Sequence, residues 1–274
     1  MARDNIVSVK DVEFIFRRRL SNAMSEVKIT YPDAREFLQI IDAVSALIEE
    51  ANFTLASDGL KLRALDPSRT AMIDLLIPRE AFEEFPEGLN EEVKIGVNFD
   101  DFKKLLRRIR KGDKLSMEVS EGKLRVRLVG KASRTMTLPL IDIGAEELPT
   151  PKVVYTVLAK ISSDSLNEAL KDADVIADAV KFDAKDDGLY VSASSDKGDV
   201  EVKFEREGEV MFEYDLKEPA TAKYSLDYLV DTISRAYRIS DIVTVEFATQ
   251  KPIALTFEIP MGGKLTYYIA PMIE

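Results

Sequence analysis

The chain has 274 residues and a formal net charge of −11, with 46% hydrophobic and 32% charged residues, which suits a globular protein of two domains. It contains neither cysteine nor histidine, and this excludes disulfide bonds, thiolate nucleophiles, Ser-His-Asp catalysis and histidine-ligated zinc. No apolar run approaches the roughly 18 residues of a membrane span, and no signal-peptide pattern opens the chain. We therefore expect an intracellular protein that is not an enzyme.

Residues 1–23 do not share the pattern of the rest of the chain. Met24 offers a second start, and the Ser21-Asn22-Ala23 that precedes it resembles a cloning scar. A basic arm built on Arg17-Arg18-Arg19 is the functional alternative. We leave this extension out of the fold prediction and place the first domain at residues 24–139.

The two halves of the remaining chain repeat each other. Asp58-Gly59 and Asp187-Gly188 each predict a tight turn that opens a strand of alternating polarity. Helices are expected at residues 33–49, 99–111, about 164–174 and 226–238. The repeat predicts an α+β protein made of two domains of one fold, joined head to tail.

Residues 99–111 concentrate positive charge. Phe102, Leu105, Leu106 and Ile109 recur at helical spacing and predict one apolar helix face. The remaining residues from 103 to 111 are all basic: Lys103, Lys104, Arg107, Arg108, Arg110 and Lys111. In so acidic a chain this cluster indicates a surface for a polyanion. An ordinary solvated helix face is the alternative.

The segment from 138 to 151 predicts the connection between the domains. Its three prolines and one glycine deny it regular structure. Ile141, Ile143 and Leu148 give it apolar side chains that suit a surface. We therefore expect a docked, extended connector at residues 140–151, followed by a second domain at residues 152–274.

Four motifs in chain order carry a resemblance to a known family: residues 58–70, 96–98, 172–180 and 263–274. Together they resemble the archaeal and eukaryotic DNA sliding clamps, the proliferating cell nuclear antigen (PCNA) family. The resemblance implies two tandem clamp domains and a ring of three subunits, with helices lining the hole and sheets outside. It further implies a processivity factor without cofactor or metal, which encircles duplex DNA and tethers DNA polymerase and other replication and repair enzymes.

The resemblance implies that the basic residues of 99–111 face DNA. The second domain would add Lys171, Arg235 and Arg238, and the first only Arg35. Positions that are usually basic in the family are here Ser45, Glu168, Asp227 and Ser234. We therefore expect one helix in each subunit to dominate the attraction to DNA.

The resemblance also implies a groove for partner peptides of the type Gln-x-x-Leu-x-x-Phe-Phe, carried by DNA polymerase, flap endonuclease, DNA ligase and the clamp loader. The matching positions are Leu65, Thr70, Met72, Leu148, Pro151, Pro252, Tyr268, Ala270, Pro271 and Ile273. An apolar plug in an apolar groove is the physical basis of such binding. For Leu65 and Met72, ordinary core packing is the alternative.

The third implied site is the subunit interface, where a strand near 133–138 would pair with a neighbour's strand near 199–204. The residues concerned are Ser133, Arg134, Thr135, Met136, Asp199, Val200, Glu201 and Val202. Pairing would remove two exposed sheet edges. The chain could close a ring with itself or with two related subunits, since both arrangements occur in the family.

Two other functions compete with a replication clamp. A metal-dependent enzyme would bind a hard cation through carboxylates, either Asp142, Glu146 and Glu147 or Asp183, Asp186 and Asp187. A clamp-like checkpoint or specialised ring subunit is the second. The intact ending Tyr268-Ile269-Ala270-Pro271 argues for a working partner groove and therefore for the replication role.

Overall fold

The computed structural model describes residues 27–89, 91–144 and 148–273, so the extension at residues 1–23 lies outside the described part. The first copy of the fold contains β1 (Val27–Tyr31), α2 (Ala34–Val44), β2 (Glu50–Ala56), β3 (Gly59–Leu65), β4 (Ala71–Pro78), β5 (Val93–Asn98), α3 (Phe99–Leu106), β6 (Lys114–Ser120), β7 (Lys123–Val129) and β8 (Arg134–Pro139). The second contains β9 (Val157–Ser162), α4 (Ser163–Ile176), β10 (Ala179–Lys185), β11 (Gly188–Ser195), β12 (Gly198–Glu205), β13 (Met211–Leu216), β14 (Ala220–Ser225), α5 (Leu226–Ala236), β15 (Ile242–Phe247), β16 (Ile253–Ile259) and β17 (Gly263–Ile269). The predicted tandem α+β arrangement is confirmed. Among the described helices, none has the length and apolar character of a membrane span.

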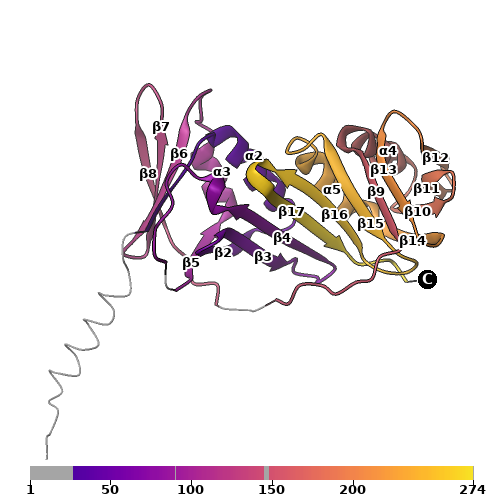
Figure 1. Cartoon of the computed structure of the whole chain (residues 1–274), viewed down its shortest axis with the longest axis horizontal. Coiled ribbons are helices and arrows are strands. Elements are labelled where there is room, and N and C mark those ends of the chain that lie inside the picture. Colours follow the sequence, from indigo (N-terminus) through magenta and orange to yellow (C-terminus); the bar gives the residue numbers. More distant parts are fainter. Residues whose placement is uncertain (1–26, 90, 145–147, 274) are drawn as a thin grey trace, which may run out of the picture.

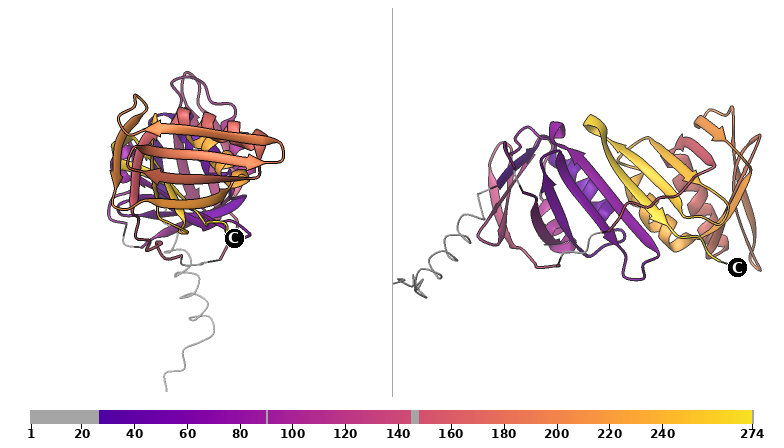
Figure 2. Two further views of the ribbon diagram at one scale, coloured as in Figure 1. Left: turned by 90° about the vertical axis from the view of Figure 1, so that its right-hand side faces the viewer. Right: turned by 60° about the horizontal axis from the view of Figure 1, so that its bottom comes forward.

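One antiparallel sheet runs through both copies (Figure 1). Its strand order is β13-β9-β15-β16-β17-β4-β3-β2-β5, and it is continuous because β17 pairs with β4 from Lys264 opposite Leu76 to Ile269 opposite Ala71. A four-stranded sheet stands at each end of the molecule, with the orders β1-β6-β7-β8 and β12-β11-β10-β14. Figure 2 shows the second of these face-on, with the rest of the chain behind it.

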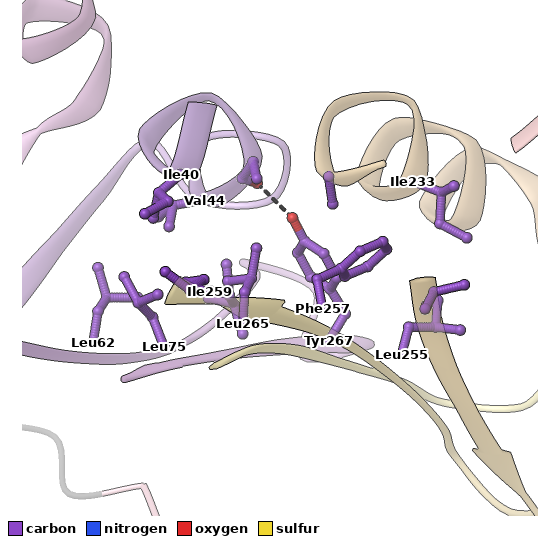
Figure 3. Packing of buried hydrophobic residues seen from close by; sticks show 14 of the residues in the cluster. Ile40, Val44, Leu62, Leu75, Ile233, Leu255, Phe257, Ile259, Leu265 and Tyr267 are labelled. Atoms are coloured by element: carbon purple, nitrogen blue, oxygen red, sulfur yellow. Dashed lines mark hydrogen bonds between the residues drawn. The ribbon is translucent and has the colours of Figure 1, made fainter. Parts of the chain in front are cut away.

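The inner face of the long sheet is apolar. Leu62, Leu75, Leu265 and Phe257 are opposite one another on four successive strands, and all are buried. Successive residues of a strand point to opposite faces of the sheet. The residues next to these four along each strand therefore face outward. Helices α2 and α5 cover the inner face, with Ile40 and Val44 of α2 directed at the strands (Figure 3).

Tyr267 ties the two copies together through this core. Its hydroxyl donates a 2.9 Å hydrogen bond from β17 to the carbonyl oxygen of Ala43 near the end of α2 (Figure 3). Burial raises the pKa of Tyr267, so the phenol keeps its proton where an exposed tyrosine would begin to lose it.

The helix predicted at 99–111 ends at Leu106, five residues early. It begins as the pattern predicts, because the side chain of Asn98 accepts the backbone N–H of Asp101 at 3.1 Å. It ends because the Asp113 carboxylate accepts the N–H of Arg110 at 2.8 Å, where a continuing helix would use a backbone carbonyl. Residues 107–111 therefore form a basic turn after α3. The helices predicted at 33–49 and 226–238 also end early, at Val44 and Ala236.

Replacing Tyr267 with phenylalanine should destabilise the chain by about 1 kcal/mol, because a buried interdomain hydrogen bond is lost. Tyr268→Phe is the matched control, since Tyr268 is the next residue and points to the outer face, where it is half-buried. Urea unfolding followed by circular dichroism measures both. Equal stability of the two variants would contradict a role for Tyr267 in joining the copies.

Candidate functional site

The structure gathers the six predicted basic residues of 103–111 at one end of α3. The two lysines on the helix pair with acids of its first turn: Lys104 with Asp101 at 2.7 Å, and Lys103 with Asp100 at 3.4 Å. The hydrogen bond that Lys104 donates to the Asp101 carboxylate raises the pKa of Lys104. The other four residues, Arg107, Arg108, Arg110 and Lys111, are exposed in the turn, and within the described ranges no carboxylate lies at ion-pairing distance from their side chains. The strongest uncompensated positive charge therefore lies in the turn.

The cations of the second copy are more dispersed. Lys171 of α4 and Arg238 beyond α5 lie over the same ring, that of Tyr237, at 5.9 and 5.4 Å from its centroid. Arg235 is half-buried and reaches Ser45, the residue after α2, at 3.5 Å. The helices α3, α2, α5 and α4 follow one another along one side of the molecule, so the basic turn and these cations share that side (Figure 1).

The strand register assembles the predicted peptide groove from both copies. Leu65, Met72, Tyr268, Ala254 and Glu246 form one row across the outer face of the long sheet. Neighbouring strands lie about 4.8 Å apart, so Leu65 and Tyr268 are within about 10 Å. Met72 and Ala254 are buried, and Leu65, Tyr268 and Glu246 are half-buried. The structure thus brings together three of the predicted groove residues.

The C-terminal tail continues this row. The Ala270 N–H bonds the Thr70 carbonyl at 2.9 Å, and the Met272 N–H bonds the Lys223 carbonyl at 2.8 Å, which places the tail beside β14. Pro271 lies between these two anchors and is half-buried. Pro252, the residue just before β16, is also half-buried. The side chain of Ile273 is left 93% exposed, and the neighbouring Met272 is 48% exposed, so this end of the tail presents apolar surface to a partner.

The described residues of the connector are docked, as predicted. The Ile141 N–H bonds the Gly96 carbonyl at 3.1 Å, and the side chain of Asn52 donates to the Gly144 carbonyl at 2.8 Å. Arg63 donates to the Leu148 carbonyl at 3.0 Å. Beneath the connector lies a recess of about 560 Å³, whose walls include Leu148 and Leu65. Pro151 is half-buried and lies outside these walls.

The predicted interface residues lie on two edge strands, β8 and β12, at opposite ends of the molecule (Figures 1 and 2). Half-buried residues alternate with exposed ones along both strands. Half-buried are Met136, Val200 and Val202, and exposed are Thr135, Asp199 and Glu201, with Ser133 exposed just before β8. Arg134 is half-buried on the same face of β8 as Met136, and its side chain pairs with Asp113 of its own chain.

A buried contact that the sequence reasoning missed explains the motif at residues 66–70. The Tyr228 hydroxyl of α5 donates to the Asp66 carboxylate at 2.9 Å, and Asp66 also accepts the N–H groups of Ser68 and Ala71. Burial raises the pKa of Asp66, but these hydrogen bonds outweigh burial and hold it below its ordinary value. The loop that carries Thr70 is thereby anchored to the other copy. The Asp-Pro-Ser order, typical of a turn, was the available signal.

Tyr155, just beyond the connector, is a second residue that the sequence reasoning missed. Its hydroxyl oxygen is buried, and within the described part of the chain it has no hydrogen-bond partner. Burial raises the pKa of Tyr155, and the nearby Tyr268 and Glu246 raise it further. Tyr155 therefore belongs with the outer row that carries Tyr268.

The carboxylates proposed for a metal-dependent enzyme do not form a cation site in the described part of the chain. Asp183 pairs with Lys185 at 3.3 Å, and Asp187 pairs with Lys203 at 3.0 Å. Among the described residues, no group of three metal-ligating side chains comes together. Glu146 and Glu147 lie outside the described residues.

The fold and sites define a two-domain clamp subunit, and comparison with known proteins agrees. Family models for the N-terminal and C-terminal domains of proliferating cell nuclear antigen match residues 24–145 and 150–272. The DNA polymerase sliding clamp 1 of Pyrobaculum aerophilum is 58% identical over 92% of this chain and 100% of its own length. The DNA polymerase sliding clamp of Thermofilum pendens is 47% identical over 90% of this chain and 100% of its own.

Solved structures give the same result. PCNA from Thermococcus kodakaraensis superposes with a TM-score of 0.85 at 28% identity, covering 90% of this chain and 100% of that one. The PCNA2–PCNA3 complex from Sulfolobus tokodaii gives 0.83 at 33% identity, with the same coverage. The chain belongs to the PCNA family of DNA polymerase sliding clamps. Members are non-catalytic processivity factors, which confirms the expectation that the chain is not an enzyme.

Gly96→Ala should undock the connector, because an added Cβ would lie 2.0 Å from the Ile141 carbonyl oxygen. We expect faster proteolysis of the connector and about tenfold weaker binding of a partner peptide, since part of the groove is displaced. Asn52→Ala, which removes one hydrogen bond to the connector, should have a smaller effect. Limited proteolysis and calorimetry provide the measurements, and a wild-type cleavage rate for Gly96→Ala would refute the docking argument.

Proposed function

We propose that this chain forms a closed ring of three subunits that encircles duplex DNA and tethers replication and repair enzymes to it. The observation that carries the proposal is the placement of edge strands β8 and β12 at opposite ends of a rigid two-domain unit. Pairing β8 of one subunit with β12 of the next would extend both small sheets and cover these two exposed edges. Residues 24–139 and 152–274 would be the two clamp domains, and residues 140–151 the connector.

The DNA contact is sequence-independent. The exposed cations on the helical side, dominated by the turn at 107–111, would face phosphates, which carry no base sequence information. The chain is acidic overall, so the outer surface would repel the same DNA. A ring held by topology and weak phosphate contacts can slide along the duplex inside the cell.

The partner site is the outer row that contains Met72 and Tyr268, bounded by the connector and the C-terminal tail. Its occupants would be peptides of the type Gln-x-x-Leu-x-x-Phe-Phe from DNA polymerase, flap endonuclease, DNA ligase and the clamp loader. The uncovered side chain of Ile273 supports an apolar occupant. A clamp that fails to bind a polymerase peptide would instead be a checkpoint or specialised ring subunit.

The ring could consist of three copies of this chain or include related subunits. A solved relative is described as a PCNA2–PCNA3 complex, which makes a mixed ring a real alternative. The half-buried Met136, Val200 and Val202 at the two edges suit either arrangement.

Reversing charge at Lys104 and Arg107 together, as K104E/R107E, should lower retention on DNA by at least about tenfold at moderate salt, because phosphate contacts become repulsive. The matched control is K123E/R127E, which makes the same charge change at exposed positions of β7 on the outer side. Polymerase stimulation and retention on circular DNA across a salt series measure the effect. Wild-type behaviour of K104E/R107E would refute the assignment of the DNA-facing surface.

Removing two apolar groove side chains, as Y268A/P271A, should weaken binding of a polymerase peptide by about thirtyfold or more while the ring stays folded. The control F212A/P219A also removes one aromatic residue and one proline, from exposed positions on and beyond β13. Calorimetry with a synthetic peptide gives the affinities. Unchanged affinity of Y268A/P271A would show that the peptide binds elsewhere.

A further inference from the structure

A buried ion pair lies between the basic turn and edge strand β8. Asp113, 4% exposed, follows the turn, and its carboxylate pairs with the guanidinium of Arg134, the first residue of β8. The same carboxylate accepts the Arg110 N–H at 2.8 Å. A second nitrogen of Arg134 donates to the carbonyl oxygen of Arg108. The pair therefore bonds the main chain of the turn at two places, Arg108 and Arg110.

The surroundings fix Asp113 in this position. Its carbonyl oxygen accepts the N–H of Ala34, the first residue of α2, at 2.9 Å. Its carboxylate lies so close to Gly130 that a Cβ there would come within 2.0 Å of it, so only glycine fits. Asp113 is thus held by α2 and by the β7–β8 loop, and the turn is bonded to Asp113.

Without this support, the basic turn would not keep a single conformation. Its four cations, Arg107, Arg108, Arg110 and Lys111, are exposed on five consecutive residues and repel one another. A turn without further main-chain bonds would sample many conformations, and each phosphate contact would then cost conformational entropy. Holding the turn in one conformation removes that cost before DNA arrives.

We propose that Asp113 and Arg134 are positioning residues for DNA: together they hold the basic turn 107–111 in its DNA-facing conformation and attach it to β8. This inference rests on the proposed clamp function. It assigns Arg134 to the DNA side of its own subunit, whereas the sequence placed it in the subunit interface. Because β8 is also the proposed pairing edge, ordering of β8 by a neighbouring subunit would order the turn as well.

Asp113→Asn distinguishes a positioning role from a purely electrostatic one, because the two roles predict opposite changes in DNA affinity. Asp113→Asn removes a negative charge beside the DNA-facing surface, so electrostatics alone predicts tighter binding. Loss of the ion pair frees the turn and predicts weaker binding, by about fivefold. Glu118→Gln is the matched control, because Glu118 pairs with Arg125 on the outer face of the same sheet and its loss changes the charge equally.

Arg134→Lys tests the pair without any change of charge. Lysine has a single ammonium group in place of the planar fork with which Arg134 reaches both Asp113 and Arg108. We expect it to weaken DNA binding by about threefold to fivefold as well. This variant decides the question if Asp113→Asn fails to fold.

The experiment uses the full chain, assembled as a ring, and a fluorescein-labelled duplex, with binding followed by fluorescence anisotropy over a salt series. Hydrogen exchange at residues 108–111 is read in parallel, because the Arg110 N–H is bonded directly to Asp113. The expected result is weaker binding and faster exchange for Asp113→Asn and Arg134→Lys, with the native mass unchanged. Asp113→Asn that binds as tightly as Glu118→Gln, or Arg134→Lys that matches wild type, would overturn the inference. A wild-type ring that does not bind the duplex would instead refute the proposed function.

Discussion

The pairing of β17 with β4 is the constraint on which the rest of the molecule depends. Six residue pairs, from Lys264–Leu76 to Ile269–Ala71, join the last strand of the second copy to a strand of the first. They turn two separate sheets into one of nine strands and leave neither partner as an edge. The relation between the copies is therefore set by backbone hydrogen bonds, and no flexible linker can alter it.

The two faces of this shared sheet have different tasks. Inward, it packs against α2 and α5 and lets Tyr267 of one copy bond Ala43 of the other. Outward, it places Tyr268 beside Met72, so the proposed peptide groove exists only because both copies contribute strands to it. Stability and the proposed partner binding would thus depend on adjacent residues of β17 that point in opposite directions.

Local sequence signals predicted much of this fold. Asp-Gly turns and alternating polarity identified β3 and β11, which begin at Gly59 and Gly188, and the repeat predicted the tandem copies. The end of α3 could not be predicted in the same way. The apolar period continues to Ile109, and the group that stops the helix is Asp113, whose position depends on Arg134 in a distant strand.

The same distinction, between what local sequence signals show and what long-range contacts decide, applies to the candidate sites. Leu65, Met72 and Tyr268 were identified by resemblance, and the register places them in one row. The bond from Tyr228 to Asp66 joins residues that are far apart in the chain, and no periodicity carries it. The pairing of Arg134 with Asp113 was missed for a related reason. An alternating pattern shows which face of the sheet a side chain takes, but not which partner it contacts.

The central claim is that two sheet edges at the ends of a rigid unit close three subunits into a ring around DNA. Its most direct test is the native mass of the purified chain, by light scattering or native mass spectrometry. A closed ring would have about three times the 30.8 kDa mass of one chain, either from this chain alone or after mixing with related clamp subunits of the same organism. A single-chain mass under both conditions would contradict the claim.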